Sequence, residues 1–294
     1  MTCVTGVGDV CVMRMSRKVV LVILACMSIA GWSQEAKPSE PLTADQIMAK
    51  VAANQDRSEQ ARKQYVYRQH IRVVLNKTNG KLVREETADY HMVPQAEKTE
   101  RKLEKLTGKY WKKGAYVEFS DEPVPDSDGI DADLARDMRE QLNEAKSKDG
   151  LGRQQFPFMS EELSKYVFQL VGRETFRGHE AYHIGFGPVD KSEYDWKGEA
   201  YIDAEDFEPI YVYTKLPRKL PFAVRALLGI DVPGYGYSLT YEKQPGGVWF
   251  PKSYGQEFTI RVLYFYNREV MLSMENKDFE QTHVETKITP EPAQ

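Results

Sequence analysis

The sequence predicts a mainly β protein: a large antiparallel half-barrel, in which an unclosed, strongly curved sheet has a few helices covering its concave side. From Tyr166 onward, segments with the composition of strands follow one another, and short turns such as Arg177-Gly178 separate most of them. Short turns join antiparallel strands, whereas parallel strands need long crossovers. Two longer segments carry apolar residues at helical spacing, which adds helices to the sheet.

Residues 1–34 have the features of a secretory signal peptide. Basic residues precede the apolar run 19–30, and small residues follow it up to Ser33. The run is too short to cross a bilayer, which takes about 20 residues. The leading residues have no signal character, so Met13 or Met15 is the expected start. We therefore expect a periplasmic or secreted protein.

The three cysteines, Cys3, Cys11 and Cys26, all lie in or before this signal. Cleavage near Ser33 would leave a chain without disulfides, thiolate nucleophiles or cysteine metal ligands. The segment Ile23-Leu-Ala-Cys26 loosely resembles a lipobox, so a lipid anchor on Cys26 is the alternative.

The charge balance argues against nucleic acid as a partner. Three of the 40 basic and one of the 44 acidic residues lie in 1–34, which leaves 37 and 43, a net charge of −6. Nucleic-acid-binding proteins usually carry a basic excess instead. The remaining chain is expected to comprise a linker at 35–42, one domain at 43–285 and a flexible tail at 286–294. One core is enough for a chain of this length.

The first half of this domain is predicted to begin with a helix. Thr43 is a candidate N-cap with Gln46 as its capping-box partner, and apolar residues recur at helical spacing to about Gln60. Strands are then expected at 65–75, with one buried and one wet face, at 81–93, polar on both sides, and at 109–119.

The second half is predicted to begin with a helix from Ile130 to about Lys148, on a stripe of Ile130, Leu134, Met138 and Leu142. Seven strands are expected after it, at 166–176, 180–187, 195–203, 207–216, 235–243, 248–262 and 263–282.

His179-Glu-Ala-Tyr-His183 spells the H-E-x-x-H pattern of zinc proteases. That chemistry requires a helix, which brings residues four apart to one metal. Here a turn precedes the motif, and Gly185, Gly187 and Pro188 follow it. On a strand the histidines would lie about 13 Å apart, too far to share an ion. We therefore predict that the motif lies on a strand and binds no metal.

Two acidic clusters invite a functional interpretation. Asp126 to Asp137 is similar to a calcium loop, but its glycine and its last ligand are misplaced, so Asp128 or Asp131 is expected instead as a helix N-cap. The carboxylates of 203–208 are expected at a solvated hairpin turn, which would not raise their pKa values. No nucleophile elbow, P-loop or dinucleotide-binding fingerprint is present.

Aromatic residues are abundant on the predicted strands. They favour strands and fill cores, but a curved sheet with an aromatic concave face can also enclose an apolar ligand. Both interpretations stay open. The candidate ligand-binding residues on strands are Trp196, Tyr211, Tyr213, Tyr237, Trp249 and Phe258.

Pro217 to Gly236 is a long break among the C-terminal hairpins, where connections usually take about 2–5 residues. It is expected to hold a short helix that acts either as a lid over the open sheet or as a contact with an anionic membrane surface. A helix packed only for stability is the alternative. The candidate lid residues are Phe222, Val224, Leu227 and Leu228.

Three C-terminal segments resemble the outer-membrane lipoprotein-sorting, LolA-like family. They are Gly172–Ile184, with a glycine turn before an A-Y-x-I-like strand; Gly198–Pro209, with G-x-x-x-I-D and a later proline; and Tyr241–Pro251, with G-x-W-x-P. The resemblance is clear over Leu170–Phe258, whereas Gln95–Pro157 matches nothing in the family. It implies an unclosed barrel with an apolar cavity for acyl chains.

The sequence therefore predicts an exported, non-enzymatic protein, without a cofactor or metal, that binds a hydrophobic small molecule or a lipoprotein acyl chain. The alternative is an interaction or sensor module that uses the same fold to bind an envelope protein.

Overall fold

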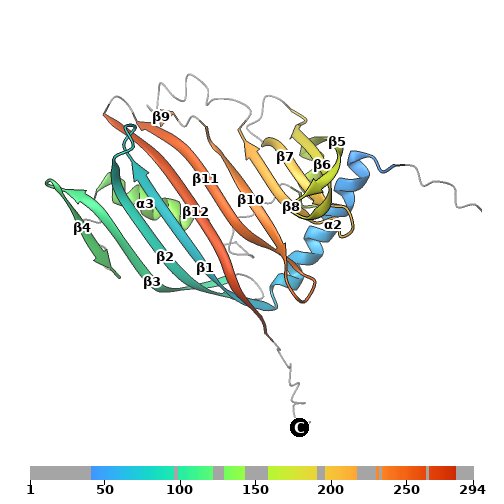
Figure 1. Ribbon diagram of the computed structural model, residues 1–294, viewed down its shortest axis with the longest axis horizontal. Coiled ribbons are helices and arrows are strands. Elements are labelled where there is room, and N and C mark those ends of the chain that lie inside the picture. Colours follow the sequence, from blue (N-terminus) through green and yellow to red (C-terminus); the bar gives the residue numbers. More distant parts are fainter. Residues whose placement is uncertain are drawn as a thin grey trace, which may run out of the picture. The chain divides into compact units, whose positions relative to one another are not determined.

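The computed structural model (Figure 1) describes residues 41–95, 99–121, 129–142, 158–190, 196–216, 230–231, 234–262 and 265–282. The chain divides into two compact units, Met1–Pro41 and Leu42–Gln294. The signal peptide and tail expected from the sequence lie outside the described residues.

In the described ranges, twelve strands form one sheet in which every pair is antiparallel. The order is β4-β3-β2-β1-β12-β11-β10-β8-β7-β6-β5, and the short β9 pairs with β11. Among the described residues, β4 and β5 are the two ends of this order, so the sheet is unclosed, as predicted. The strands are β1 (Tyr65–Asn76), β2 (Leu82–Pro94), β3 (Thr99–Lys112), β4 (Ala115–Ser120), β5 (Tyr166–Phe176), β6 (His179–Pro188), β7 (Lys197–Asp203), β8 (Pro209–Lys215), β9 (Ile230–Asp231), β10 (Gly236–Lys243), β11 (Trp249–Val262) and β12 (Tyr266–Gln281).

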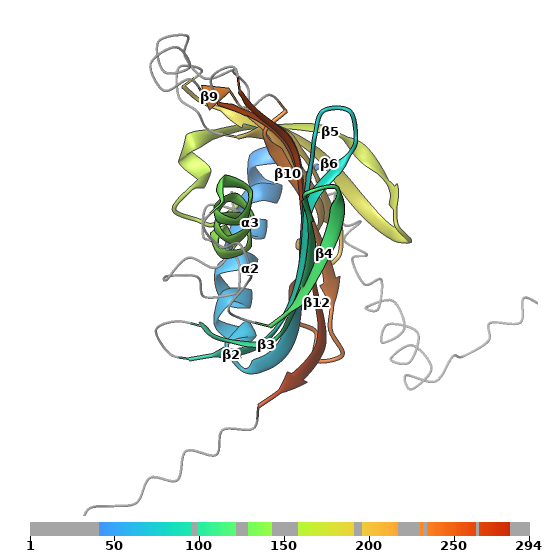
Figure 2. The same cartoon turned by 90° about the vertical axis from the view of Figure 1, so that its left-hand side faces the viewer.

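Two α-helices, α2 (Ala44–Arg62) and α3 (Ile130–Gln141), lie on the same face of the sheet (Figure 2). We call this the concave face, and the opposite one the open face. α2 packs against β5 and β11, and α3 against β1 and β2. A 3-10 turn, η2 (Leu163–Lys165), precedes β5. Within the described part of the chain, neither helix combines the length and apolar character that crossing a bilayer requires.

α2 begins as the sequence predicts. The Gln46 backbone N–H donates to Thr43 Oγ1 at 3.2 Å, and the Thr43 N–H donates to Gln46 Oε1 at 2.9 Å. This reciprocal pair satisfies two N–H groups that the helix itself leaves free. Ile47, Met48 and Val51 are fully buried against the sheet.

α3 departs from the prediction at its N-terminus, and one residue of its predicted apolar stripe is exposed. Its N-cap is Gly129, which has no side chain to donate or accept a capping hydrogen bond, and Asp131 lies inside the first turn. Asp128, the other expected N-cap, lies outside the described residues. The Asp131 carboxylate accepts from Arg268 Nε and Nη2 at 2.7 and 2.9 Å. Of the expected apolar stripe, Leu142 is fully buried and Leu134 and Met138 pack partly buried against the core, whereas Ile130 is 58% exposed. The buried residues are Ala132, Ala135, Arg139 and Leu142.

Two strand predictions were also wrong. The strand expected at 109–119 is two strands, β3 and β4, joined by a tight turn at Lys113 and Gly114, both with positive φ. β2, expected to be polar on both sides, buries Ala88, Tyr90 and Met92 on the concave face. Polar and charged residues alternate with these apolar positions, so the buried face of β2 was not recognised from the sequence.

The strand register separates the side chains into rows on the two faces. The open-face row is Arg72, Ser273, Gly255, Ser238 and Tyr213, on β1, β12, β11, β10 and β8. The next row, on the concave face, is Val73, Leu272, Gln256, Tyr237 and Thr214. Every member of the concave row is at most 5% exposed, because the helices and neighbouring side chains cover this face.

Candidate functional site

Three of the predicted ligand-binding residues, Trp196, Tyr237 and Phe258, meet on the concave face. Trp196 contacts the Tyr237 ring edge-on at 5.0 Å and stacks on Tyr235 at 5.9 Å, and Tyr235 reaches Phe258 at 5.3 Å. Tyr237 and Phe258 are buried, whereas Trp196 and Tyr235 are only partly covered. We call these four residues the concave cluster. Its partly covered members are the ones that a ligand could reach.

The concave cluster lies where the chain enters and leaves the predicted lid. The Leu216 N–H donates to the Tyr235 carbonyl at 3.0 Å, which joins the residues that flank segment 217–233. The candidate lid residues Phe222, Val224, Leu227 and Leu228 lie outside the described residues. Their roles as lid or membrane contact therefore stay predictions.

Tyr211 and Tyr213 lie on the open face, away from the concave cluster. Tyr211 belongs to an aromatic series with Tyr201 and Phe176, at centroid distances of 6.4 and 5.9 Å, and the Arg177 guanidinium lies 5.2 Å from the Tyr211 ring. Tyr213 is 44% exposed. These contacts hold Tyr211 in place and leave much of the neighbouring Tyr213 ring in solvent.

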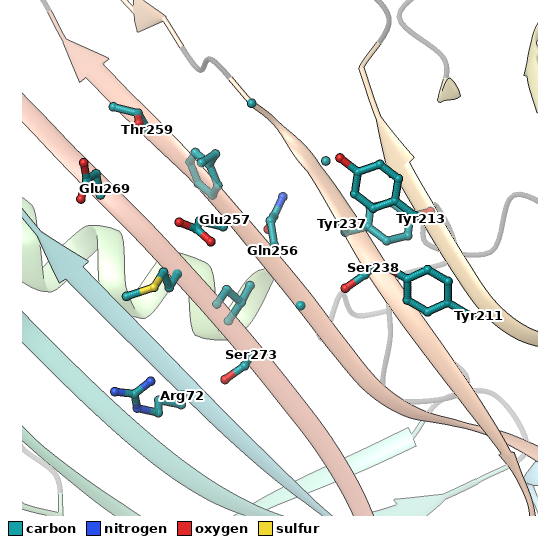
Figure 3. A pocket seen from close by; sticks show the side chains of 16 residues that line it. Arg72, Tyr211, Tyr213, Tyr237, Ser238, Gln256, Glu257, Thr259, Glu269 and Ser273 are labelled. Carbon is teal, nitrogen blue, oxygen red and sulfur yellow. The ribbon is translucent and has the colours of Figure 1, made fainter. Parts of the chain in front are cut away.

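The two tyrosines form one wall of a groove of about 740 Å³. In Figure 3, Tyr211 and Tyr213 stand on one side of the groove, and Arg72 and Glu269 on the other. The groove crosses small residues of three neighbouring strands. Those floor residues are Gly236, Ser238, Gly255 and Ser273. Tyr237 and Phe258 also border the groove, but strand alternation directs their side chains to the concave face.

Trp249, the remaining candidate on a strand, is a structural anchor. It is 3% exposed, and its indole N–H donates to Asp206 Oδ2 at 2.9 Å. Its carbonyl accepts from Arg62 Nη1 of α2 at 2.9 Å. Trp249 thus connects the β7–β8 turn and α2 to the start of β11. It belongs neither to the groove lining nor to the concave cluster.

The carboxylates of the β7–β8 turn are not all solvated, which corrects the expectation from sequence. Asp203 and Glu208 are 6% and 5% exposed, because α2 covers the turn. Glu208 accepts from Ser58 Oγ at 2.6 Å and from Gln55 Nε2. Burial raises the pKa of Glu208, and the hydrogen bonds from α2 only partly offset that effect. The turn is an Asx-turn: Asp203 Oδ1 accepts from the backbone N–H groups of Glu205 and Asp206, at 2.9 and 2.8 Å.

The H-E-x-x-H sequence lies on β6, a strand, as predicted. His179 Nδ1 lies 2.8 Å from Asp203 Oδ2, and His183 lies between Glu174 at 3.2 Å and Glu199 at 3.1 Å. These contacts tie β6 to its neighbouring strands. Within the ranges that the structure describes, no three His, Cys, Asp or Glu side chains are grouped to hold a metal ion.

A buried charged cluster under α3 was missed by sequence reasoning. Arg84 Nε donates to Glu86 Oε1 at 2.6 Å, and both side chains are at most 3% exposed. Arg139 of α3 approaches Glu86 Oε2 at 4.0 Å, and Tyr110 and Phe119 lie beneath the Arg84 guanidinium. The only signal in the sequence is an arginine and a glutamate two apart on a strand, which is also typical of an exposed face.

Comparison with known proteins gives distant structural neighbours. One is a putative outer membrane lipoprotein-sorting protein domain from Vibrio parahaemolyticus, at 13% identity and a TM-score of 0.35, over 82% of this chain and 95% of that one. A LolA superfamily protein from Nitrosomonas europaea matches at 12% and 0.35, over 85% and 99% of the two chains. A DUF1329 family protein from Desulfovibrio piger matches at 10% and 0.37, over 84% and 96%.

Lipoprotein-sorting domains, which the sequence resembles, are thus among the structural neighbours. No family model and no curated protein matches the sequence. At identities of 10 to 13% and TM-scores of 0.35 to 0.37, the three structural matches carry no argument about function.

Proposed function

We propose that this chain is a non-catalytic protein of the cell envelope that binds a hydrophobic ligand, a lipid or a lipoprotein acyl chain, on the concave face. The observation that carries the proposal is the concave cluster. Two of its aromatic rings, Trp196 and Tyr235, continue the buried core outward without being fully covered themselves. Partly covered aromatic rings that border a core are suited to an apolar ligand, whose burial completes their cover.

Segment 217–233 would act as the lid over such a ligand. Leu216, which precedes it, donates its backbone N–H to the carbonyl of Tyr235, a member of the concave cluster. If Leu227 and Leu228 face the ligand, replacing both by Ser will reduce uptake of a fluorescent fatty acid with little change in melting temperature. A large fall in melting temperature with uptake preserved would assign the two leucines to structural packing instead.

The ligand itself is tested on the full chain exported from a bacterial host. We expect organic extraction and mass spectrometry to find a lipid in a fixed ratio to the protein. The delipidated protein should take up a fluorescent fatty acid, and Trp196→Ser should weaken that uptake about tenfold or more, which corresponds to about 1.4 kcal/mol.

Tyr213→Ser is the matched control, since it removes an aromatic ring from the open face of the same sheet. It should leave fatty-acid uptake unchanged. If mass spectrometry finds no lipid in the extract and the delipidated wild-type protein takes up no fatty acid, the proposal is wrong. If Tyr213→Ser loses uptake and Trp196→Ser keeps it, the ligand lies on the wrong face for this proposal.

Binding of an envelope protein is the second candidate, and β5 favours it. β5 ends the sheet order, so one side of its backbone faces no other strand among the described residues. Val167 and Val171 on this strand are 60% and 58% exposed. An edge strand with exposed apolar side chains is a template for strand addition. Val171→Lys would block such pairing without affecting fatty-acid uptake.

A further inference from the structure

We propose that the open-face groove is a binding site for an uncharged oligosaccharide. The groove lies across the sheet from the concave cluster, so this proposal does not depend on the hydrophobic ligand. At about 740 Å³, its volume falls within the range of about 300–1,000 Å³ that is typical of ligand sites.

The groove exists because short side chains occupy its floor. Ser273, Gly255 and Ser238 lie next to one another in one row across β12, β11 and β10. Gly236 extends the floor toward β8, and a Cβ there would lie 2.2 Å from the Thr214 carbonyl oxygen. Taller walls on both sides of these residues leave a trough with hydroxyl groups and backbone on its floor.

The tyrosine wall suits the face of a sugar ring. Tyr213 is 44% exposed, and Tyr211 beside it is held by Arg177 at 5.2 Å and Tyr201 at 6.4 Å. A pyranose ring presents C–H groups on its faces and hydroxyls around its rim. Tyrosine matches this pattern, because its ring offers an apolar surface and its hydroxyl a hydrogen-bonding group.

The opposite wall offers hydrogen-bonding groups, and Arg72, the one basic residue that lines the groove among the described residues, is ion-paired. Arg72 donates to Glu85 Oε1 from Nε at 2.8 Å, and its Nη2 lies 2.7 Å from the same oxygen. Glu257 and Glu269 add two carboxylates to the groove lining. Carboxylates accept hydrogen bonds from sugar hydroxyls and repel anions, so the groove favours an uncharged saccharide.

Other ligand classes fit the groove less well. An acyl chain would cover Arg72, Glu257 and the floor serines without replacing their contacts with water, which is costly. An extended peptide gains affinity from main-chain hydrogen bonds at a sheet edge. The strands beneath the groove are paired on both sides, so their backbone groups are already used. Sheet faces that bind oligosaccharides are known from other β folds.

The test measures binding of soluble cellohexaose, maltohexaose and chitohexaose to the full chain by calorimetry. We expect at least one to bind with a Kd of about 1 mM or tighter. Tyr213→Ala should weaken that binding about tenfold, whereas Tyr213→Phe, which keeps the ring, should change it no more than about threefold. An anionic probe, oligogalacturonate, should not bind.

Tyr116→Ala is the matched control, because Tyr116 is a 43% exposed tyrosine at the far edge of the sheet, on β4. It should leave saccharide binding unchanged. The proposal is overturned if none of the three saccharides binds, if Tyr213→Ala and Tyr116→Ala bind equally well, or if oligogalacturonate binds best. Fatty-acid uptake by Tyr213→Ala reports separately on the concave face, so failure of one proposal is distinguishable from failure of the other.

Discussion

The two faces of the sheet use tyrosine in opposite ways. Tyr237 on β10 and Tyr213 on β8 belong to adjacent rows of neighbouring strands, yet they are 2% and 44% exposed. Tyr237 contacts the Tyr254 and Trp196 rings, at 5.4 and 5.0 Å, and burial raises its pKa well above the ordinary value. The same residue type thus supports the fold on one face and is available to a ligand on the other.

The largest expected difference in stability is between alanine variants of these two tyrosines. Tyr237→Ala should lower the free energy of unfolding by about 3 to 5 kcal/mol, because it leaves a cavity in a packed aromatic layer. Tyr213→Ala should change it by no more than about 0.5 kcal/mol. Urea unfolding of both variants measures the difference, and similar losses would contradict the assignment of the two faces.

Two glycines sharpen the comparison within the open face. A Cβ at position 236 would lie 2.2 Å from the backbone oxygen of Thr214, whereas a Cβ at position 255 would lie 3.2 Å from Ser238 Oγ, which can rotate. Gly236→Ala should therefore destabilise by about 1 to 3 kcal/mol, and Gly255→Ala by less than about 0.5 kcal/mol. Thermal unfolding of the two variants tests this order, and its reversal would mean that the groove floor is packed differently.

Glu208 tests how α2 is held against the sheet. Burial places the folded-state pKa of Glu208 above its unfolded value near 4.5, so the protonated carboxyl favours the folded state. This stabilisation is fully present below about pH 4.5. This contribution is lost as pH rises through the raised folded-state pKa. The stability of wild type relative to Glu208→Gln, which cannot titrate, should therefore fall as pH rises from about 4.5 through the raised pKa of Glu208. Urea unfolding across this range measures it, and a constant difference would argue against the buried environment.

Asp206, in the same turn, should behave in the opposite sense and more weakly. Burial opposes ionisation, but hydrogen bonds from Lys243 and Trp249 outweigh it and hold the pKa of Asp206 below its ordinary value. The ion pair is therefore present above the unfolded pKa and lost as pH falls through the folded one. Asp206→Asn should cost no more than about 1 kcal/mol at pH 7, and less in acid. A larger cost at low pH would contradict this.

The sequence predicted much of the secondary structure and less of the candidate site. The helix at α2 follows from its capping box and apolar spacing, and the strand placement of His179 and His183 from the glycines beside them, because both signals are local. The split of 109–119 into β3 and β4 was missed, since the turn at Lys113 and Gly114 lacks a proline or asparagine. The buried cluster of Arg84, Glu86 and Arg139 was missed because its charges stabilise one another only after α3 has docked.

By itself, the sequence determined that this chain forms antiparallel strands rich in aromatic residues, because alternation and turn chemistry act between near neighbours. It did not determine which aromatic residues share a site. In β8, tyrosines 211 and 213 alternate with Ile210 and Val212, so both faces of the strand are apolar in composition. In the folded chain, Ile210 and Val212 are buried in the core, and the two tyrosines lie beside an open groove. Contacts between distant parts of the chain make that choice, and no local pattern records them.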